Sequence, residues 1–176
     1  QAKRAGAEAL EFSGGGEPTL HRDFKMIYEH AANILGYKIG IITHACNPMP
    51  LESMVKHFKY VRCGLDAATA ETHDLIKLNK KKDYWFPKAV ENIREMVRLR
   101  DLMAGKDFTI GIKVVLNSIN YHELQAMIDM ADELKVNYIQ IKREHSSDHD
   151  LDDMQIYNAQ EILDGYAKAR DGDHHP

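Results

Sequence analysis

The sequence is poor in cysteine, and this scarcity limits the chemistry that the chain can support by itself. Its 176 residues include two cysteines, Cys46 and Cys63, which lie far apart and match no metal-ligand spacing. Neither a disulfide framework nor a zinc site is predicted, and no residue is assigned as a metal ligand. Such sparing use of cysteine favours a reducing cytoplasm.

An excess of basic residues and a long hydrophobic run are also lacking. The chain has 23 lysines and arginines against 27 aspartates and glutamates, for a formal net charge of -4. A nucleic-acid-binding face usually appears as a basic excess, and a membrane span needs roughly 20 apolar residues. We therefore expect neither a nucleic acid nor a membrane as a partner.

Short apolar runs alternate with longer segments of helical periodicity, which is typical of parallel β/α units. Strands are predicted at 9–12, 38–43, 60–65, 109–116 and 138–141. Helices are predicted at 23–35, 50–57, 86–104, 121–134 and 152–169. Asn120 is expected to cap the fourth helix, with Glu123 completing a capping box. The sequence is thus assigned to the α/β class, as one domain over residues 1–176.

Alternation along the later strands predicts one apolar and one polar face. Val61, Cys63 and Leu65 are expected to pack against helices, which turns Arg62, Gly64 and Asp66 the other way. The same count adds three residues to the polar face, Lys113, Gln140 and Lys142. Two interpretations stay open: a face that lines a binding site, and internal ion pairing between Arg62 and Asp66.

Residues 13–20, Ser-Gly-Gly-Gly-Glu-Pro-Thr-Leu, directly follow the first predicted strand. Consecutive glycines at such a place allow the backbone to approach a ligand closely, and the Glu17 carboxylate beside them can bind an ammonium group. A phosphate is disfavoured because Glu17 would repel it. The alternative is a tight βα turn without a ligand.

The segment 11–24 resembles the second-strand motif of radical S-adenosylmethionine enzymes, in which Gly-Gly-Glu holds the amino group of the methionine moiety. That motif falls on Gly15, Gly16 and Glu17, and Pro18 follows as in the family. The next strand ends in Thr43-His44-Ala45, where many members have Thr-Asn-Gly. Residues 60–73 are similar to the fourth-strand segment, with Gly64 in place of a serine that contacts the cofactor. Residues 86–93, 110–117 and Asn120 continue the resemblance, which spans about 5–145.

The resemblance implies an incomplete, TIM-type partial (β/α)6 barrel, with about five parallel strands, outer helices and a site at the carboxyl ends of the strands. It implies that the chain binds S-adenosylmethionine and assigns no catalytic residue. The implied cofactor-binding residues are Gly15, Gly16, Glu17, Pro18, Thr43, Gly64, Asp66, Lys113 and Asn117.

The family's Cys-x-x-x-Cys-x-x-Cys loop is absent from the sequence, and we expect it upstream of Gln1. Its thiolates would hold a [4Fe–4S] cluster, which supplies the electron that cleaves S-adenosylmethionine to a 5'-deoxyadenosyl radical. The family also implies a reductant such as ferredoxin or flavodoxin. We expect the full-length protein to be an enzyme of unknown substrate and this chain alone to be inactive. The alternatives are a non-catalytic module and an anion-binding (β/α) barrel-like domain without iron–sulfur chemistry.

Two further features remain open. His145, Asp148 and His149 follow the last predicted strand, where they belong to a solvated loop or contact the substrate; their spacing matches no metal motif. Trp85 is expected to pack under a loop or to cover the mouth of a pocket.

Overall fold

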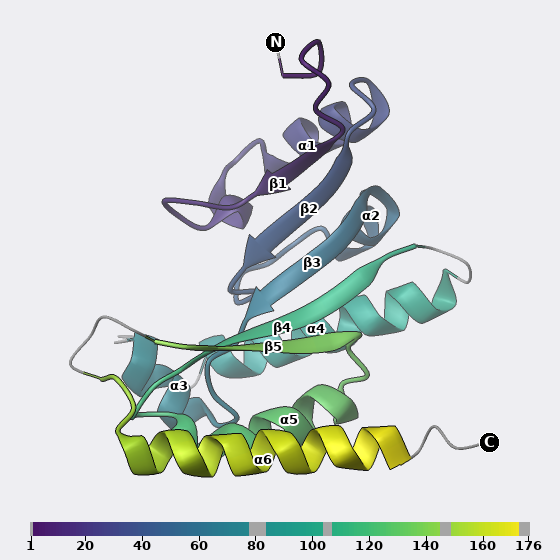
Figure 1. The fold of residues 1–176 in the computed structure, drawn as a ribbon. Coiled ribbons are helices and arrows are strands. Elements are labelled where there is room, and N and C mark those ends of the chain that lie inside the picture. Colours follow the sequence, from purple (N-terminus) through teal and green to yellow (C-terminus); the bar gives the residue numbers. More distant parts are fainter. Residues whose placement is uncertain (1, 78–83, 104–106, 145–148, 173–176) are drawn as a thin grey trace.

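Five parallel strands form a single sheet in the order β1-β2-β3-β4-β5 (Figure 1). The structure is a computed structural model that describes residues 2–77, 84–103, 107–144 and 149–172. The strands are β1 (Ala9–Phe12), β2 (Lys38–Thr43), β3 (Phe58–Gly64), β4 (Thr109–Leu116) and β5 (Tyr138–Arg143). Because every pairing is parallel, all the carboxyl ends lie at the same edge of the sheet.

Helices connect the strands in the pattern expected of β/α units. They are α1 (Phe24–Asn33), α2 (Leu51–His57), α3 (Ala70–Lys77), α4 (Trp85–Leu102), α5 (Leu124–Glu133) and α6 (Asp153–Gly172). The short 3-10 helices η1 (Pro18–Leu20) and η2 (Tyr121–Glu123) precede α1 and α5. No helix of the described residues is long and apolar enough to cross a membrane.

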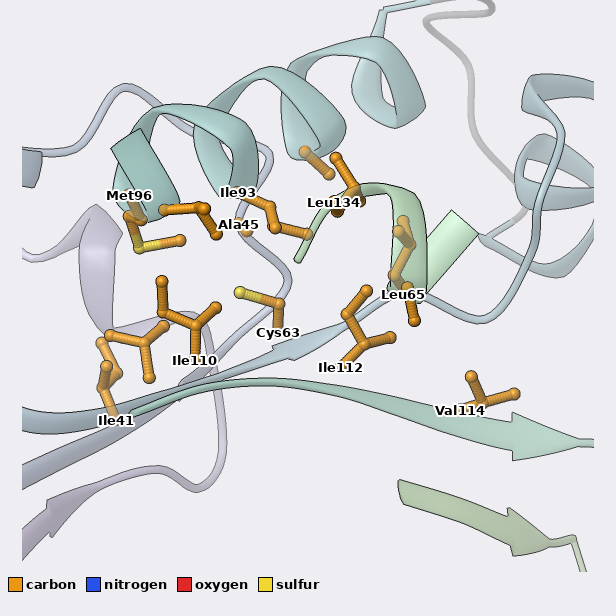
Figure 2. Close-up of a cluster of buried hydrophobic side chains, with 14 of the residues drawn as sticks. Ile41, Ala45, Cys63, Leu65, Ile93, Met96, Ile110, Ile112, Val114 and Leu134 are labelled. Carbon is orange, nitrogen blue, oxygen red and sulfur yellow. The ribbon is translucent and has the colours of Figure 1, made fainter. Parts of the chain in front are cut away.

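The core lies between the sheet and α4. Figure 2 shows Cys63, Ile110 and Ile112 pointing from the strands toward the helix that carries Ile93 and Met96. All five side chains are fully buried. The predicted alternation is thus confirmed for β3 and β4, because alternate residues of these strands pack against helices and the residues between them face the open side of the sheet.

One helix was not predicted from the sequence. α3 turns Thr72 and His73 into the interior, whereas its Leu75 is exposed. Its buried face is therefore polar, and the hydrophobic periodicity by which a helix is recognised is absent.

The expected capping box at Asn120 and Glu123 is wrong. The Asn120 side chain makes no capping bond; its amide nitrogen donates to the carbonyls of Asp66 and Val115, which ties the ends of β3 and β4 together. The Glu123 carboxylate instead accepts bonds from the backbone nitrogens of Ala68 and Thr69, just before α3. Glu123 thus accepts backbone hydrogen bonds at the start of α3, about 50 residues earlier in the chain. Rules that consider only neighbouring residues do not detect such a contact.

Candidate functional site

A cavity of about 310 Å³ lies at the carboxyl ends of the strands, where a barrel of this type places its chemistry. The turn after β1 contributes Ser13, Gly14, Gly16 and Glu17, and the end of β2 contributes Ile42, Thr43 and His44. β3 and the residues after it contribute Gly64 and Asp66, β4 contributes Lys113 and Val115, and α3 contributes Lys77. Its volume falls in the range of small-molecule pockets, about 300 to 1,000 Å³.

The cavity brings together most of the residues predicted to bind a cofactor. Gly16, Glu17, Thr43, Gly64, Asp66 and Lys113 line it. Gly15, Pro18 and Asn117 do not belong to the lining. Asn117 is engaged in the loop after β4, where its amide nitrogen donates to Glu144 Oε2 at 2.8 Å and its amide oxygen accepts from the Ile119 backbone.

The glycine turn presents bare backbone to this cavity. Gly14 has φ +122°, a conformation that L side chains rarely adopt, and the Gly16 nitrogen donates to the Gly14 carbonyl at 2.9 Å. A Cβ added at Gly14, Gly15 or Gly16 would meet nothing within 4 Å. The space beside the turn is therefore open, and the main chain is accessible to a ligand.

The carboxylate of Glu17 braces the site. Its Oε1 accepts hydrogen bonds from the Thr43 hydroxyl at 2.6 Å and the Thr19 hydroxyl at 2.7 Å, and its Oε2 accepts from the His44 backbone nitrogen at 3.0 Å. Burial raises the pKa of Glu17, but the bonds from Thr43, His44 and Thr19 outweigh it and hold that pKa below its usual value. Both oxygens thus accept hydrogen bonds from the protein, so the carboxylate fixes the glycine turn to the end of β2.

His44 contacts both the Glu17 carboxylate and the ring of Trp85. Its Nε2 lies 3.2 Å from Glu17 Oε2, and its Nδ1 accepts a hydrogen bond from the Cys46 backbone nitrogen. The imidazole stacks on the Trp85 ring at 5.7 Å between centroids and 8° between planes. Trp85 thus packs beside a residue that lines the cavity.

Ala45 occupies the place at which the family often has glycine, and the backbone explains that preference. Ala45 is buried with φ +57°, in the left-handed region that favours glycine. The amide nitrogen of Asn92, on α4, donates to the carbonyls of Ala45 at 2.7 Å and Asn47 at 2.9 Å. Asn92 is a positioning residue that sequence reasoning missed, although a polar residue on the otherwise apolar buried face of α4 was a readable signal.

Asp66 pairs with a partner other than the one considered from the sequence. Its Oδ2 accepts from Lys77 Nζ at 2.6 Å and its Oδ1 accepts from the Val115 backbone at 2.8 Å. The pairing of Asp66 with Arg62 is therefore wrong. Lys77 was missed because it belongs to α3, the helix that the sequence pattern did not reveal.

Lys113 differs from Lys77 in having no carboxylate partner among the residues that the structure describes. An unpaired ammonium group at a cavity wall is available to a ligand carboxylate. This cation, the open glycine backbone and the braced carboxylates fit a zwitterionic small molecule such as an amino acid derivative.

The cysteines offer no comparable fit to an iron–sulfur cluster. Cys46 and Cys63 are free and buried, and burial raises the pKa of Cys46 to about 11 and raises that of Cys63 as well. Metal ligation needs thiolates. In the described ranges no group of three or more histidine, cysteine or acidic side chains is arranged to hold a metal ion.

Two other regions add nothing to the site. A larger hollow of about 450 Å³ lies between α1 and α2, where Lys56 pairs with Glu52 and Lys25 with Glu29 on the outer surface. His145 and Asp148 lie outside the described residues, and the carbonyl of His149 accepts a bond from the Ser118 backbone.

Solved structures share the fold of this chain at low sequence identity, whereas no family model matches the chain. SuiB from Streptococcus suis, bound to S-adenosylmethionine, has a TM-score of 0.66 and 17% identity over 89% of this chain and 34% of that one. A domain of the pyruvate-formate lyase-activating enzyme from Bacteroides vulgatus has a TM-score of 0.65 and 16% identity over 92% and 96%. The protein anSMEcpe, with bound AdoMet and a peptide, has a TM-score of 0.65 and 18% identity over 95% and 49%.

The chain therefore spans about a third of SuiB and about half of anSMEcpe. At identities below 20%, this similarity shows a shared fold. The fold expected from the sequence is confirmed: five parallel strands form a partial (β/α) barrel, the fold that the chain shares with these proteins.

Proposed function

We propose that this chain is part of a radical S-adenosylmethionine enzyme and that the cavity at the carboxyl ends of the strands binds S-adenosylmethionine. The observation that carries the proposal is the convergence of Gly16, Glu17, Thr43, Gly64, Asp66 and Lys113 on one cavity. These residues come from four strand ends, and the sequence alone predicts each of them as a cofactor-binding residue. S-adenosylmethionine (AdoMet) is bound in the solved structures of SuiB and anSMEcpe, which is consistent with this assignment.

Each group has a definite role in the proposal. The backbone of the glycine turn meets the ammonium group of the methionine moiety, and the Lys113 ammonium pairs with its carboxylate. Glu17 acts as a brace that fixes the turn, and Asp66 is fixed by Lys77 and the Val115 backbone. Gly64 leaves room at the cavity wall, since a Cβ there would meet only the Thr43 carbonyl at 3.8 Å.

The electron for cleavage of the sulfonium would come from a [4Fe–4S] cluster held by a segment outside this chain and reduced by a protein such as ferredoxin or flavodoxin. An anion-binding barrel is the weaker alternative, because the Glu17 and Asp66 carboxylates at the cavity repel a phosphate.

The test is calorimetric titration of S-adenosylmethionine into the full-length protein. Lys113→Gln removes the cation and should weaken binding by about tenfold or more, the value of a charge-assisted hydrogen bond. Lys25→Gln, on the exposed side of α1, is the matched control and should bind as the wild type does. Equal affinity of Lys113→Gln and the wild type would overturn the assignment.

A further inference from the structure

A second group of polar side chains lies on the open face of the sheet, one layer below the cavity. In the parallel register, Gly64, Lys113 and Gln140 lie side by side at the cavity level. One layer toward the amino ends of the strands, Arg62 lies beside Gly111 and Tyr138 in the same way. Residues two apart on a strand are separated by about 6 to 7 Å, so this layer is within reach of a molecule that also contacts the cavity.

Two tyrosine rings cover glycines on this face. A Cβ added at Gly40 would lie 2.1 Å from the Tyr60 ring, and one added at Gly111 would lie 2.1 Å from the Tyr138 ring. Each ring therefore rests directly on the backbone of the neighbouring strand, which is possible because glycine has no side chain there. The two tyrosine rings therefore lie flat against this face of the sheet and leave the space above them open.

Arg62 lies between these rings with most of its donors free. Its Nε donates to the Tyr138 hydroxyl at 3.3 Å, and its guanidinium carbon lies 5.9 Å from the centre of the Tyr60 ring. A guanidinium has five N–H donors, and the described residues occupy this one. Glu11, the nearby carboxylate, instead accepts a hydrogen bond from the Tyr60 hydroxyl. Among the described residues, the other N–H donors of Arg62 have no hydrogen-bond acceptor and are available to an anion.

An unused acceptor accompanies this cation. The Oε1 atom of Gln140 is buried and has no hydrogen-bond partner among the described residues. Gln140 lies on the same face of β5 as Tyr138, two residues further along. A buried acceptor without a donor costs free energy, and a ligand N–H would supply that donor.

The charge balance selects the kind of anion. Arg62 has Glu11 nearby, one layer further toward the amino ends of the strands, and Asp66 and Glu17 at the cavity above. A single guanidinium near several carboxylates suits a monoanion better than a phosphate dianion, and its planar fork matches a carboxylate in a bidentate manner.

We propose that Arg62, together with Gln140 and the Tyr60 and Tyr138 rings, binds the substrate, and that the substrate carries a carboxylate together with an N–H donor, as an amino acid or a peptide does. Arg62 binds the carboxylate, Gln140 Oε1 accepts the N–H, and the Tyr60 and Tyr138 rings pack against the apolar part. This assignment rests on the proposed function for its identification of the bound molecule as the substrate.

The experiment uses N-acetyl-L-phenylalanine, which has a carboxylate, an amide N–H and an apolar ring. Its carboxamide has the same shape without the charge, and phenyl phosphate carries a phosphate instead. Dissociation constants are measured by NMR titration into the full-length protein, with and without S-adenosylmethionine. The free acid should bind at least about tenfold more tightly than the carboxamide and more tightly than phenyl phosphate.

Arg62→Gln should abolish the preference for the free acid, whereas Arg94→Gln, on the exposed face of α4, should retain it. Equal binding of acid and carboxamide, no binding of either, preference for phenyl phosphate or an unchanged preference in Arg62→Gln would overturn the assignment. If Arg62→Gln does not fold, the affinities of the wild type for the free acid, the carboxamide and phenyl phosphate still test the assignment.

Affinity for S-adenosylmethionine is measured in the same samples and should be the same in Arg62→Gln as in the wild type. If the wild type does not bind S-adenosylmethionine, the proposed function is contradicted. If the wild type binds S-adenosylmethionine but does not prefer the free acid to the carboxamide, only the Arg62 site is contradicted.

Discussion

The hydroxyl of Thr43 donates a hydrogen bond of 2.6 Å to Oε1 of Glu17, across 26 residues of sequence. This bond joins the glycine turn after β1 to the end of β2, and both groups are nearly inaccessible to solvent. The shape of the cavity therefore depends on a buried carboxylate that is satisfied entirely by the protein, because an unpaired charge at this place would be costly.

Removal of the Thr43 hydroxyl should destabilise the fold. Thr43→Val keeps the shape but removes the donor to Glu17 and the acceptor of the Ala45 backbone nitrogen, which lies 3.0 Å away. The expected loss is about 1.5 to 3 kcal/mol in the free energy of unfolding, measured with guanidinium chloride. Thr109→Val, at the start of β4, is the control and should change stability by less than about 0.5 kcal/mol. A Thr43→Val protein as stable as the control would show that the brace is unimportant.

The brace should also make the protein sensitive to acid. Because the pKa of Glu17 is lowered in the folded state, its stabilising contribution is complete above its usual value near 4.5 and is lost as the pH falls through the lowered pKa. The difference in unfolding free energy between the wild type and Glu17→Gln should therefore be constant from pH 7 to about 4.5 and shrink below it. Glu123, whose pKa is lowered as well, is present in both proteins and cancels in the comparison. A difference that grows toward low pH would have the wrong sign for this explanation.

Much of the fold was predictable from the alternation of apolar residues. β1, β2 and β4 have the predicted bounds, and the buried residues of β2 and β4 recur at every second position or form a short apolar run. α3 was not predictable in this way, because the side chains it buries, Thr72 and His73, are polar.

The site was predictable only in part, for a related reason. A motif identified the glycine turn and the strand ends, and parallel pairing brings such ends together. The partners of each charged group are a tertiary property: Asp66 pairs with Lys77 on the unpredicted helix, and Glu17 accepts bonds from Thr43, the last residue of β2, and from His44, which follows it. The motif therefore located Glu17 but did not show that both of its oxygens accept hydrogen bonds from the protein.

Replacement of Ala45 by glycine should stabilise the protein slightly. The left-handed conformation, φ +57°, costs a residue with a Cβ about 1 to 2 kcal/mol, whereas the added freedom of glycine in the unfolded chain costs about 0.5 to 1 kcal/mol. Ala45→Gly should thus raise the free energy of unfolding by up to about 1.5 kcal/mol. Ala31→Gly, inside α1, should lower it by about 1 kcal/mol. If both substitutions were equally destabilising, the conformation of Ala45 would carry no strain.

The 176-residue chain should not assemble a [4Fe–4S] cluster. Two thiols are too few for the three thiolate ligands, and burial raises the pKa values of both, to about 11 for Cys46. After anaerobic reconstitution with iron and sulfide, the protein should show no charge-transfer absorbance and no bound iron. The same treatment of a protein that contains a Cys-x-x-x-Cys-x-x-Cys segment is the positive control. The two thiols of this chain should react with a disulfide reagent only after unfolding. Four irons per chain with cluster absorbance in the 176-residue protein would contradict the burial argument, because thiols with raised pKa values inside the core would then have to leave it to bind metal.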